Sequence, residues 1–225
     1  MEKTTTIENA QKIMGRNFIG PDQLVKISPY LPAPVGKSTP TIPFALDFLK
    51  KIKKDYILIL GAPLTINAMR EIFGIDPAKS EPCFYNQDWY LKEKFANKIT
   101  LAPKWYLVKK SVDKKTRGLH PNIIEKKLRN KEHFPLAVLC AFTFFSYYLL
   151  HKEILWEKDF IWCSDKDANG DRIYVGRYKD PKGMNKNGFN IHRHLSIKKS
   201  YGFSLEIVGQ YVSIKKDSAS VKKQS

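Results

Sequence analysis

The sequence predicts an α+β fold in which a helical N-terminal half, with a central buried helix, packs on a mainly antiparallel C-terminal sheet. Three observations predict it. Before residue 134, apolar positions recur at the spacing of amphipathic helices, with strand-like runs between them. Residues 134–150 form one uncharged, largely apolar segment. From residue 159 onward the period changes to two and turn residues separate short segments, which is typical of antiparallel strands.

The N-terminal segment, residues 1–43, is expected to hold two helices and a linker. Residues 6–14 place apolar side chains on one face, and in residues 20–27 the helix is opened by Pro21, which suits a first helical turn, and Asp22. Residues 28–43 contain five of the thirteen prolines, which exclude a helix or an inner strand there.

Residues 44–212 are expected to form a single α+β domain. An amphipathic helix over residues 44–54 leads into an apolar strand over residues 55–61, whose continuous apolar character predicts cover on both faces. Thr65 is a capping residue for the next helix. The remaining elements before residue 134 are a helix over 65–74, a helix over 85–98, a strand over 104–112 and a helix over 120–130.

Residues 135–150 predict a helix that is apolar on every side. Such a helix is either enclosed by other elements or spans a membrane, and the segment is at the lower length limit for a span. The buried position is favoured, and a membrane partner is not expected.

Four short strands are expected after this helix, over residues 159–165, 171–178, 188–197 and 201–208. Residues 213–225 are rich in Lys and Ser and predict a basic disordered tail.

The charge balance indicates the class of partner. Lys and Arg number 39 against 22 Asp and Glu, a formal net charge of +17. Such an excess favours polyanions, nucleic acid above all. Most of these residues are Lys, so a Lys-rich proteome that spreads charge over every face is the alternative.

The cysteines indicate the compartment. Cys83, Cys140 and Cys163 are odd in number and form no CxxC pair, which argues against a disulfide framework or a zinc ribbon. The N-terminus lacks the apolar core of a signal peptide. A cytoplasmic location is therefore expected.

An acidic turn raises the question of a metal. Its oxygen-bearing residues alternate around Gly170 as in the first half of an EF-hand loop, but Gly176 stands where that loop needs a bidentate Glu. The alternative is a hairpin turn, in which Asn169-Gly170 favours type I′. The hairpin is preferred and no cofactor is expected, with calcium as the open alternative. The weak metal candidates are Asp165, Asp167, Asn169 and Asp171.

No catalytic set stands out, and the chain is not expected to be an enzyme. Walker, GxSxG and strand-linked GxGxxG motifs are missing from the sequence. His192 and His194 share a strand face but lack a third zinc ligand at local spacing. A metal-dependent hydrolase that uses Asp165, Asp167 and His192 is a distant alternative.

The stretch FPLAVLCAFTFFSYYLLHKEILWEKDFIWCSDKDANGDRIYVGRYKDPKGMNKNGFNIHRHLS resembles an uncharacterised protein family of environmental bacteria. Its members share an apolar helix, a strand ending in Ser-Asp, and a D-x-D-x-[DN]-G turn into a strand. The pieces FIGPDQL, IPFALDFLKK, DYILILGAPLTI and DWYLKEKFA have counterparts in the same order, so the resemblance covers roughly residues 12–205.

Some of these relatives resemble C-type-lectin-like domains, the group that includes formylglycine-generating-enzyme-like domains and the variable proteins of diversity-generating retroelements. The resemblance implies a C-type-lectin-like fold in which residues 178–201 form a displayed binding surface. This chain has Lys, His and Arg there, where the variable type is rich in Asn and Trp. The enzyme branch needs reactive cysteines or a copper site late in the chain, and no cysteine follows Cys163.

The expected function is therefore a non-enzymatic ligand-binding module with a basic, aromatic C-terminal surface. A protein that binds single-stranded or non-specific nucleic acid is the alternative, because basic and aromatic residues interleave there. For any one of these residues, packing inside the sheet is the competing role. The candidate contacts are Arg172, Tyr174, Arg177, Tyr178, Lys182, Asn187, Asn190, His192, Arg193 and His194.

Overall fold

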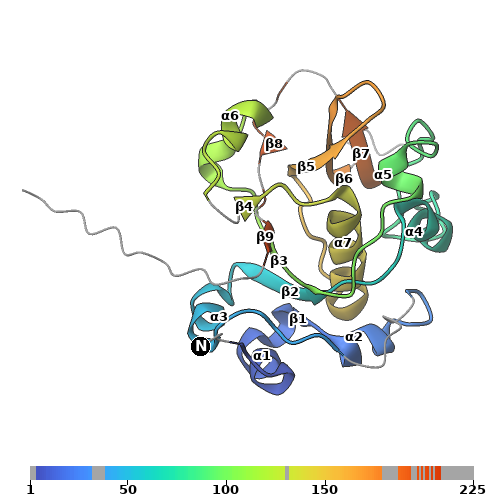
Figure 1. Cartoon of the computed structure of the whole chain (residues 1–225). Helices are drawn as coiled ribbons and strands as arrows, with labels where there is room; N and C mark the ends of the chain where they lie inside the picture. Colours follow the sequence, from blue (N-terminus) through green and yellow to red (C-terminus); the bar gives the residue numbers. More distant parts are fainter. Residues whose placement is uncertain are drawn as a thin grey trace, which may run out of the picture.

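The computed structural model describes residues 4–31, 39–129, 132–178, 187–193, 197, 199, 201–202, 204 and 206–208. Figure 1 shows how their helices and strands are arranged. The α-helices are α1 Ile7–Met14, α2 Pro21–Lys26, α3 Leu46–Ile52, α4 Ile66–Phe73, α5 Lys94–Asn97, α6 Pro121–Glu125 and α7 Ala137–His151, with single 3-10 turns η1 Gly15–Asn17 and η2 Lys114–Thr116. The strands are β1 Phe18–Ile19, β2 Tyr56–Leu60, β3 Trp105–Lys109, β4 Glu132–His133, β5 Phe160–Lys166, β6 Arg172–Tyr178, β7 Gly188–Arg193, β8 Tyr201–Gly202 and β9 Glu206–Val208.

The strands form two sheets, and most of their pairings are antiparallel. The first sheet has the order β1-β2-β3-β9-β4, in which only β1 pairs in parallel. The second has the order β7-β6-β5-β8, in which only β8 pairs in parallel. The predicted mixed α+β class with mainly antiparallel pairing is confirmed.

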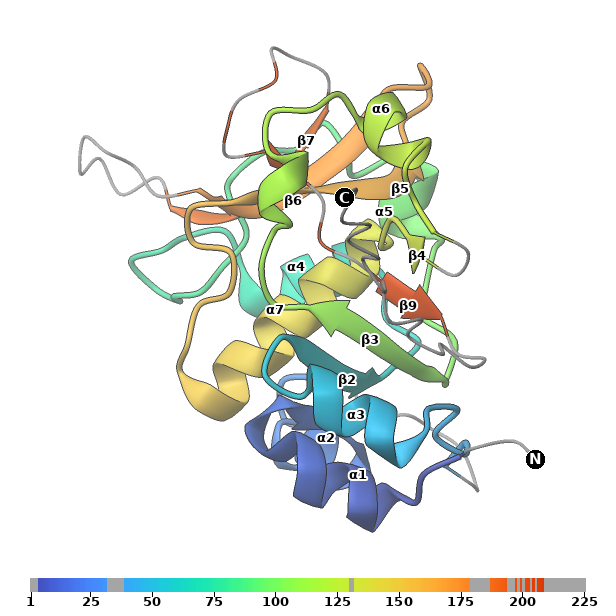
Figure 2. The same ribbon diagram turned by 90° about the vertical axis from the view of Figure 1, so that its left-hand side faces the viewer.

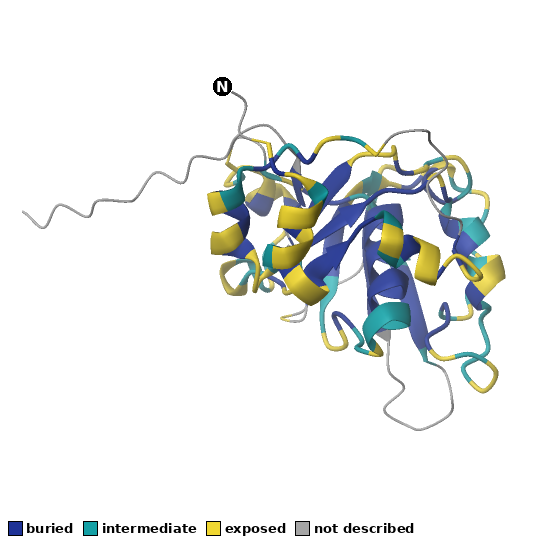
Figure 3. Cartoon of the chain, turned by 90° about the horizontal axis from the view of Figure 1, so that it is seen from below, coloured by how far each residue is buried: buried dark blue, intermediate teal, exposed yellow. Residues whose placement is uncertain are grey.

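Helix α7 lies between the two sheets and is the centre of the core (Figures 1 and 2). Its residues from Ala137 to Tyr147 are buried, so the predicted enclosed helix is confirmed. Phe145 stacks on Phe73 of α4, with ring centroids 4.0 Å apart, and also on Phe84. Figure 3 shows the buried strands and α7 enclosed by helices whose outer faces are exposed. In the described part of the chain, no helix combines the length and apolarity that crossing a bilayer requires.

The N-terminal helices belong to the same core as the rest of the chain. Strand β1 adds to the first sheet beside β2, and α1 and α3 lie on the side of that sheet away from α7 (Figure 2). The buried Tyr147 hydroxyl of α7 donates to Asn17 Oδ1 (3.2 Å) and accepts from Lys110 Nζ (3.0 Å). The segment boundary expected after residue 43 therefore does not separate two cores. The tail expected over residues 213–225 and part of the Pro-rich linker lie outside the described residues.

Three predicted elements differ in the structure. The helix predicted over residues 120–130 ends at Glu125, the last residue of α6. The helix predicted over residues 85–98 is reduced to α5, because side chains of its first half bind β7. Gln87 Nε2 and Trp89 Nε1 both donate to the carbonyl oxygen of Ile191, at 2.5 and 3.2 Å. These long-range bonds hold residues 86–92 in turns.

The single strand predicted over residues 201–208 is split between the sheets. Strand β8 pairs with β5, whereas β9 lies between β3 and β4. Alternation of apolar residues predicts a strand but not its partner, and here the chain passes from one sheet to the other. Between the two strands, the hydroxyl of Ser204 donates to the Lys109 carbonyl oxygen at 2.6 Å.

Candidate functional site: a basic pocket beside helix α6

The structure places many of the predicted contact residues inside the second sheet, not on its surface. Tyr174, Arg177 and Asn190 are buried, and Arg172, Asn187, His192 and Arg193 are half-buried. Lys182, His194 and the side chain of Tyr178 lie outside the described residues. The surface exposure expected of Tyr174, Arg177 and Asn190 is therefore not found.

Tyr174 is part of an aromatic cluster. Its ring contacts Trp162 and Tyr201, with centroids 4.9 and 4.8 Å away, and stacks on the His192 ring at 5.4 Å. Burial, and then a hydrogen bond with Tyr201, raises the pKa of Tyr174 well above its ordinary value. The neutral phenol packs the sheet, which is the competing role named above.

Two further predicted residues hold loops onto the sheet. The guanidinium of the buried Arg177 forms a salt bridge with Glu81. Burial raises the pKa of Glu81, and the charge of Arg177 opposes that rise. The amide oxygen of Asn190 accepts from Gln87 Nε2 at 3.1 Å. These contacts pair polar groups that the fold removes from solvent, although the Nε atom of Arg177 forms no hydrogen bond with a described residue.

The acidic turn is a hairpin whose carboxylates point in different directions. Asp167 Oδ1 accepts the backbone N–H groups of Asn169 and Asp171, and its Oδ2 accepts from Arg193 at 2.7 Å. Asp165 instead binds the backbone N–H of Ala137 at 2.6 Å. The hydrogen bonds of Asp167 and the charge of Arg193, against the effect of burial, lower the pKa of Asp167. Among the described residues, no group of three His, Cys, Asp or Glu could hold a metal ion.

The turn type differs from the expected type I′. Gly170 has φ +88°, whereas Asn169 does not have a positive φ. Gly170 N–H donates to the Asp167 carbonyl oxygen at 3.0 Å. Because type I′ needs a positive φ at both central residues, the bond and the left-handed glycine instead match a turn closed by a bulge at Gly170.

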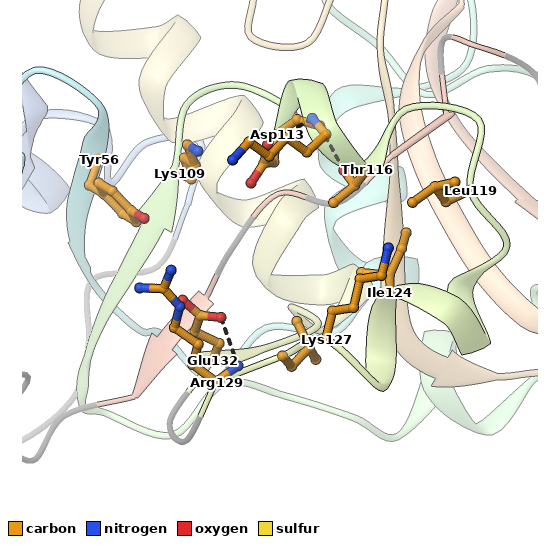
Figure 4. A pocket seen from close by; sticks show the side chains of 11 residues that line it. Tyr56, Lys109, Asp113, Thr116, Leu119, Ile124, Lys127, Arg129 and Glu132 are labelled. Atoms are coloured by element: carbon orange, nitrogen blue, oxygen red, sulfur yellow. Dashed lines mark hydrogen bonds between the residues drawn. The ribbon is translucent and has the colours of Figure 1, made fainter. Parts of the chain in front are cut away.

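A pocket of about 380 Å³ lies beside α6 (Figure 4). It is lined by residues of the first sheet and of the segment that follows β3. Five segments supply its walls, namely the start of β2, the end of β3, the η2 turn, the α6 region and β4. Its lining residues are Tyr56, Lys109, Asp113, Lys115, Thr116, Leu119, Ile124, Lys127, Leu128, Arg129 and Glu132. We call it the basic pocket.

Cations outnumber carboxylates in this lining by four to two. Both carboxylates already accept backbone hydrogen bonds: Asp113 Oδ1 from Lys115 N–H and Glu132 Oε2 from Arg129 N–H, each at 2.9 Å. Within the described ranges, none of the four cationic side chains forms a salt bridge. The described lining therefore has two more positive than negative groups, and its cations are not engaged in salt bridges within the described residues.

Tyr56 adds a neutral hydroxyl to the basic pocket. Burial, and then the charges of Glu132, Asp55 and Asp113, raises the pKa of Tyr56 to about 12. At neutral pH the phenol keeps its proton and can donate a hydrogen bond. Figure 4 shows its hydroxyl directed toward the space between Lys109 and Arg129.

None of the lining residues of the basic pocket was among the predicted contacts. The only sequence signal is the density of Lys in residues 109–115 and 126–131, which also fits a solvated surface. Their convergence depends on β9, which joins β4 to β3, and the sequence pattern does not reveal that pairing.

Comparison with known proteins identified no relative. The chain matches no protein-family model, no curated protein and no solved structure.

Proposed function

We propose that the protein is a non-enzymatic ligand-binding module and that its ligand is a small anion held in the basic pocket. One observation carries the proposal: Lys109, Lys115, Lys127 and Arg129 surround a cavity of about 380 Å³, and none has a salt bridge among the described residues. A phosphate group or a similar multivalent oxyanion fits this donor set, because Arg and Lys bind such oxygens through charge-assisted hydrogen bonds.

The exposure of the pocket sets the expected strength of binding. Lys115, Lys127 and Arg129 are exposed, so solvent and salt screen each contact. The contributions of the screened cations to affinity add only in part, and the affinity falls as the salt concentration rises. Affinity for a divalent or more highly charged anion should therefore exceed that for a monovalent one.

Calorimetric titration with inorganic phosphate, pyrophosphate and chloride tests the proposal. We expect pyrophosphate to bind more tightly than phosphate, and both to weaken about ten-fold or more in the double variant Lys127→Met/Arg129→Met, which removes two charge-assisted contacts. The control variant Lys51→Met/Lys54→Met lowers the net charge equally on exposed residues of and after α3. Equal weakening in both variants, or no binding by the wild type at low salt, overturns the proposal.

Nucleic-acid binding is the second candidate function. The net charge of +17 favours it, and lysines run through the segments on both sides of α6. A gel-shift titration with single-stranded DNA at 50 and about 200 mM salt tests it, because release of counterions makes affinity fall steeply with salt. The absence of a shift at low salt removes this function and leaves the small-anion proposal standing.

We also propose the finer assignments that the sequence favours. The second sheet, built from the last third of the chain, supports a C-type-lectin-like fold and the family resemblance noted above. Cys83, Cys140 and Cys163 are buried free thiols, which supports a reducing, cytoplasmic location. A solved structure of a related chain tests the fold, and fractionation of the source cell tests the location.

A further inference from the structure

The basic pocket is larger than an inorganic anion requires. Its volume of about 380 Å³ lies within the range of about 300–1,000 Å³ that small-molecule sites have. A free phosphate ion fills only a small part of this space. Apolar side chains bound the rest of it, namely Leu119, Ile124 and Leu128, and a free phosphate makes no use of them. The pocket therefore has room and surface for a second chemical group beside the anion.

One end of the pocket is built on the first sheet. Tyr56 of β2 and Lys109 of β3 are direct partners in the antiparallel register, so their side chains lie on the same face of the sheet. Figure 4 shows the Arg129 guanidinium and the Tyr56 hydroxyl at this end. Three hydrogen-bond donors therefore meet here, and the sheet fixes the backbone of two of them.

The Tyr56 hydroxyl is open to a ligand. It forms no hydrogen bond with a described residue, and it is not one of the described polar atoms that the protein encloses without a partner. Figure 4 shows it directed into the pocket. Burial, and then the nearby carboxylates, raises the pKa of Tyr56 to about 12, so the phenol keeps its proton at neutral pH and can donate it to an anion.

The charge of the lining matches a dianion. The described lining has four cationic and two acidic side chains, which leaves a net charge of +2. A phosphomonoester has a charge of about −1.5 to −2 at pH 7, because its second pKa is near 6. A carboxylate or a phosphodiester has a single negative charge and leaves part of the positive charge unbalanced. The charge balance therefore favours a phosphomonoester.

The other end of the pocket is apolar and is backed by the core. Leu119 and Leu128 are half-buried and pack against the buried cluster that contains Tyr174. The backbone N–H of Leu119 donates to the Thr116 carbonyl oxygen at 3.2 Å, which fixes this wall. Figure 4 shows Leu119 on the side of the pocket away from Tyr56. The donor end and the apolar end are thus separate.

We infer that the ligand of the basic pocket is a small organic phosphomonoester whose apolar or aromatic body lies against Leu119 and Leu128. This ligand class rests on the proposed function, because the pocket must first bind an anion. The phosphate oxygens accept a hydrogen bond from the Tyr56 hydroxyl and pair with Lys109 and Arg129. The body, joined through the ester oxygen, extends toward α6 and displaces water from the apolar wall.

Calorimetric titration with phenyl phosphate and inorganic phosphate, at about pH 8 where both are largely dianions, tests this ligand class. We expect phenyl phosphate to bind the wild type about ten-fold more tightly, because part of its ring leaves water on binding. Tyr56→Phe should weaken the binding of both ligands about ten-fold, since each loses one hydrogen bond to a charged group.

A change in the apolar wall should act on one ligand more than on the other. Leu119→Ala should reduce the advantage of phenyl phosphate over inorganic phosphate about three-fold, because less apolar surface is covered. This advantage is a ratio within one protein, so partial unfolding, which lowers both affinities alike, does not change it. The control is Ile123→Ala, at an exposed residue of α6 outside the lining, which should keep the wild-type ratio.

The outcomes separate the ligand class from the proposed function. A wild type that binds inorganic phosphate, but binds phenyl phosphate no more tightly, overturns the ligand class alone. Binding of neither ligand at low salt overturns the proposed function and the ligand class with it. A Leu119→Ala protein with the wild-type ratio, or a Tyr56→Phe protein with the wild-type affinities, contradicts the placement of the ligand and overturns the ligand class as well.

Discussion

The carboxylate of Asp165 in β5 accepts a 2.6 Å hydrogen bond from the backbone N–H of Ala137, the first residue of α7. Leu136, at the N-cap position, supplies no capping side chain. A residue from the following strand therefore caps the buried helix, and its negative charge lies at the positive end of the helix dipole. The acidic turn thus begins with a structural carboxylate.

We expect Asp165→Ala to lower the free energy of unfolding by about 1–2 kcal/mol, the cost of losing a helix cap. Urea denaturation measures it. Asp165→Asn keeps an acceptor oxygen at the same place and should lose less. If both variants are as stable as the wild type, the capping role is wrong.

Stability should depend on the ionisation of Glu206. Burial, with a smaller contribution from Asp165 and against that of Lys104, raises the pKa of Glu206 from 4.5 to about 7. A raised folded-state pKa means that the native state holds this proton more tightly than the unfolded state does. The stabilisation of the folded state by this proton is complete below pH 4.5 and is lost as the pH rises through 7. The free energy of unfolding falls by about 3 kcal/mol over this range. We expect Glu206→Gln to remove this fall between pH 5 and 8.

The control for Glu206 is Glu71→Gln, a change at an exposed residue of α4 that should keep the wild-type pH dependence. Denaturant midpoints at pH 5, 6.5 and 8 compare the three proteins. A Glu206→Gln protein with the same slope against pH as the wild type contradicts the prediction.

The Tyr147 hydroxyl should couple the N-terminal segment to α7. Removing it in Tyr147→Phe leaves the buried Asn17 Oδ1 without this donor, which costs about 1–3 kcal/mol. The neighbouring Tyr148→Phe changes a half-buried side chain and should cost less. Hydrogen exchange of α1 amides should accelerate in the first variant alone, and equal exchange in both would show that the segment is held by other contacts.

Gly170 should be required because of its backbone conformation, and not because a side chain at this position would lack room. Its φ is +88°, and a Cβ there would meet no atom within 4 Å. Gly170→Ala should therefore cost about 1 kcal/mol of stability from strain alone, and Gly170→Asn less, because Asn tolerates the left-handed region. Thermal unfolding compares them. A stable Gly170→Ala protein would contradict the described turn.

The sequence predicts the elements whose local pattern is strong. Residues 135–150 are largely apolar on every side, which predicts a helix that is enclosed or spans a membrane, and the structure shows it enclosed. Residues 86–92 were wrongly predicted as helical because their turns depend on bonds to Ile191, about a hundred residues away in the chain. The split of residues 201–208 between two sheets has the same cause, since strand partners are chosen by tertiary packing.

The candidate sites were predicted less well than the fold. Among the described residues, none of the predicted contacts lines the basic pocket, and Glu125 holds Arg172 on the second sheet. Interleaved basic and aromatic residues directed the prediction to the second sheet, and alternation cannot tell which face of that sheet is covered. Tyr56 and Arg129 meet at one pocket although they are far apart in sequence, and no spacing rule connects them.

The placement of β9 has a consequence for biosynthesis. Strand β4 joins the first sheet through β9, and Glu132 of β4 forms part of the basic pocket. On the ribosome, β2 and β3 emerge and can pair long before residues 206–208 are translated. The wall of the pocket is thus completed only after residues 206–208 are translated, so a chain that is terminated before them has α7 and most of its core but no finished basic pocket.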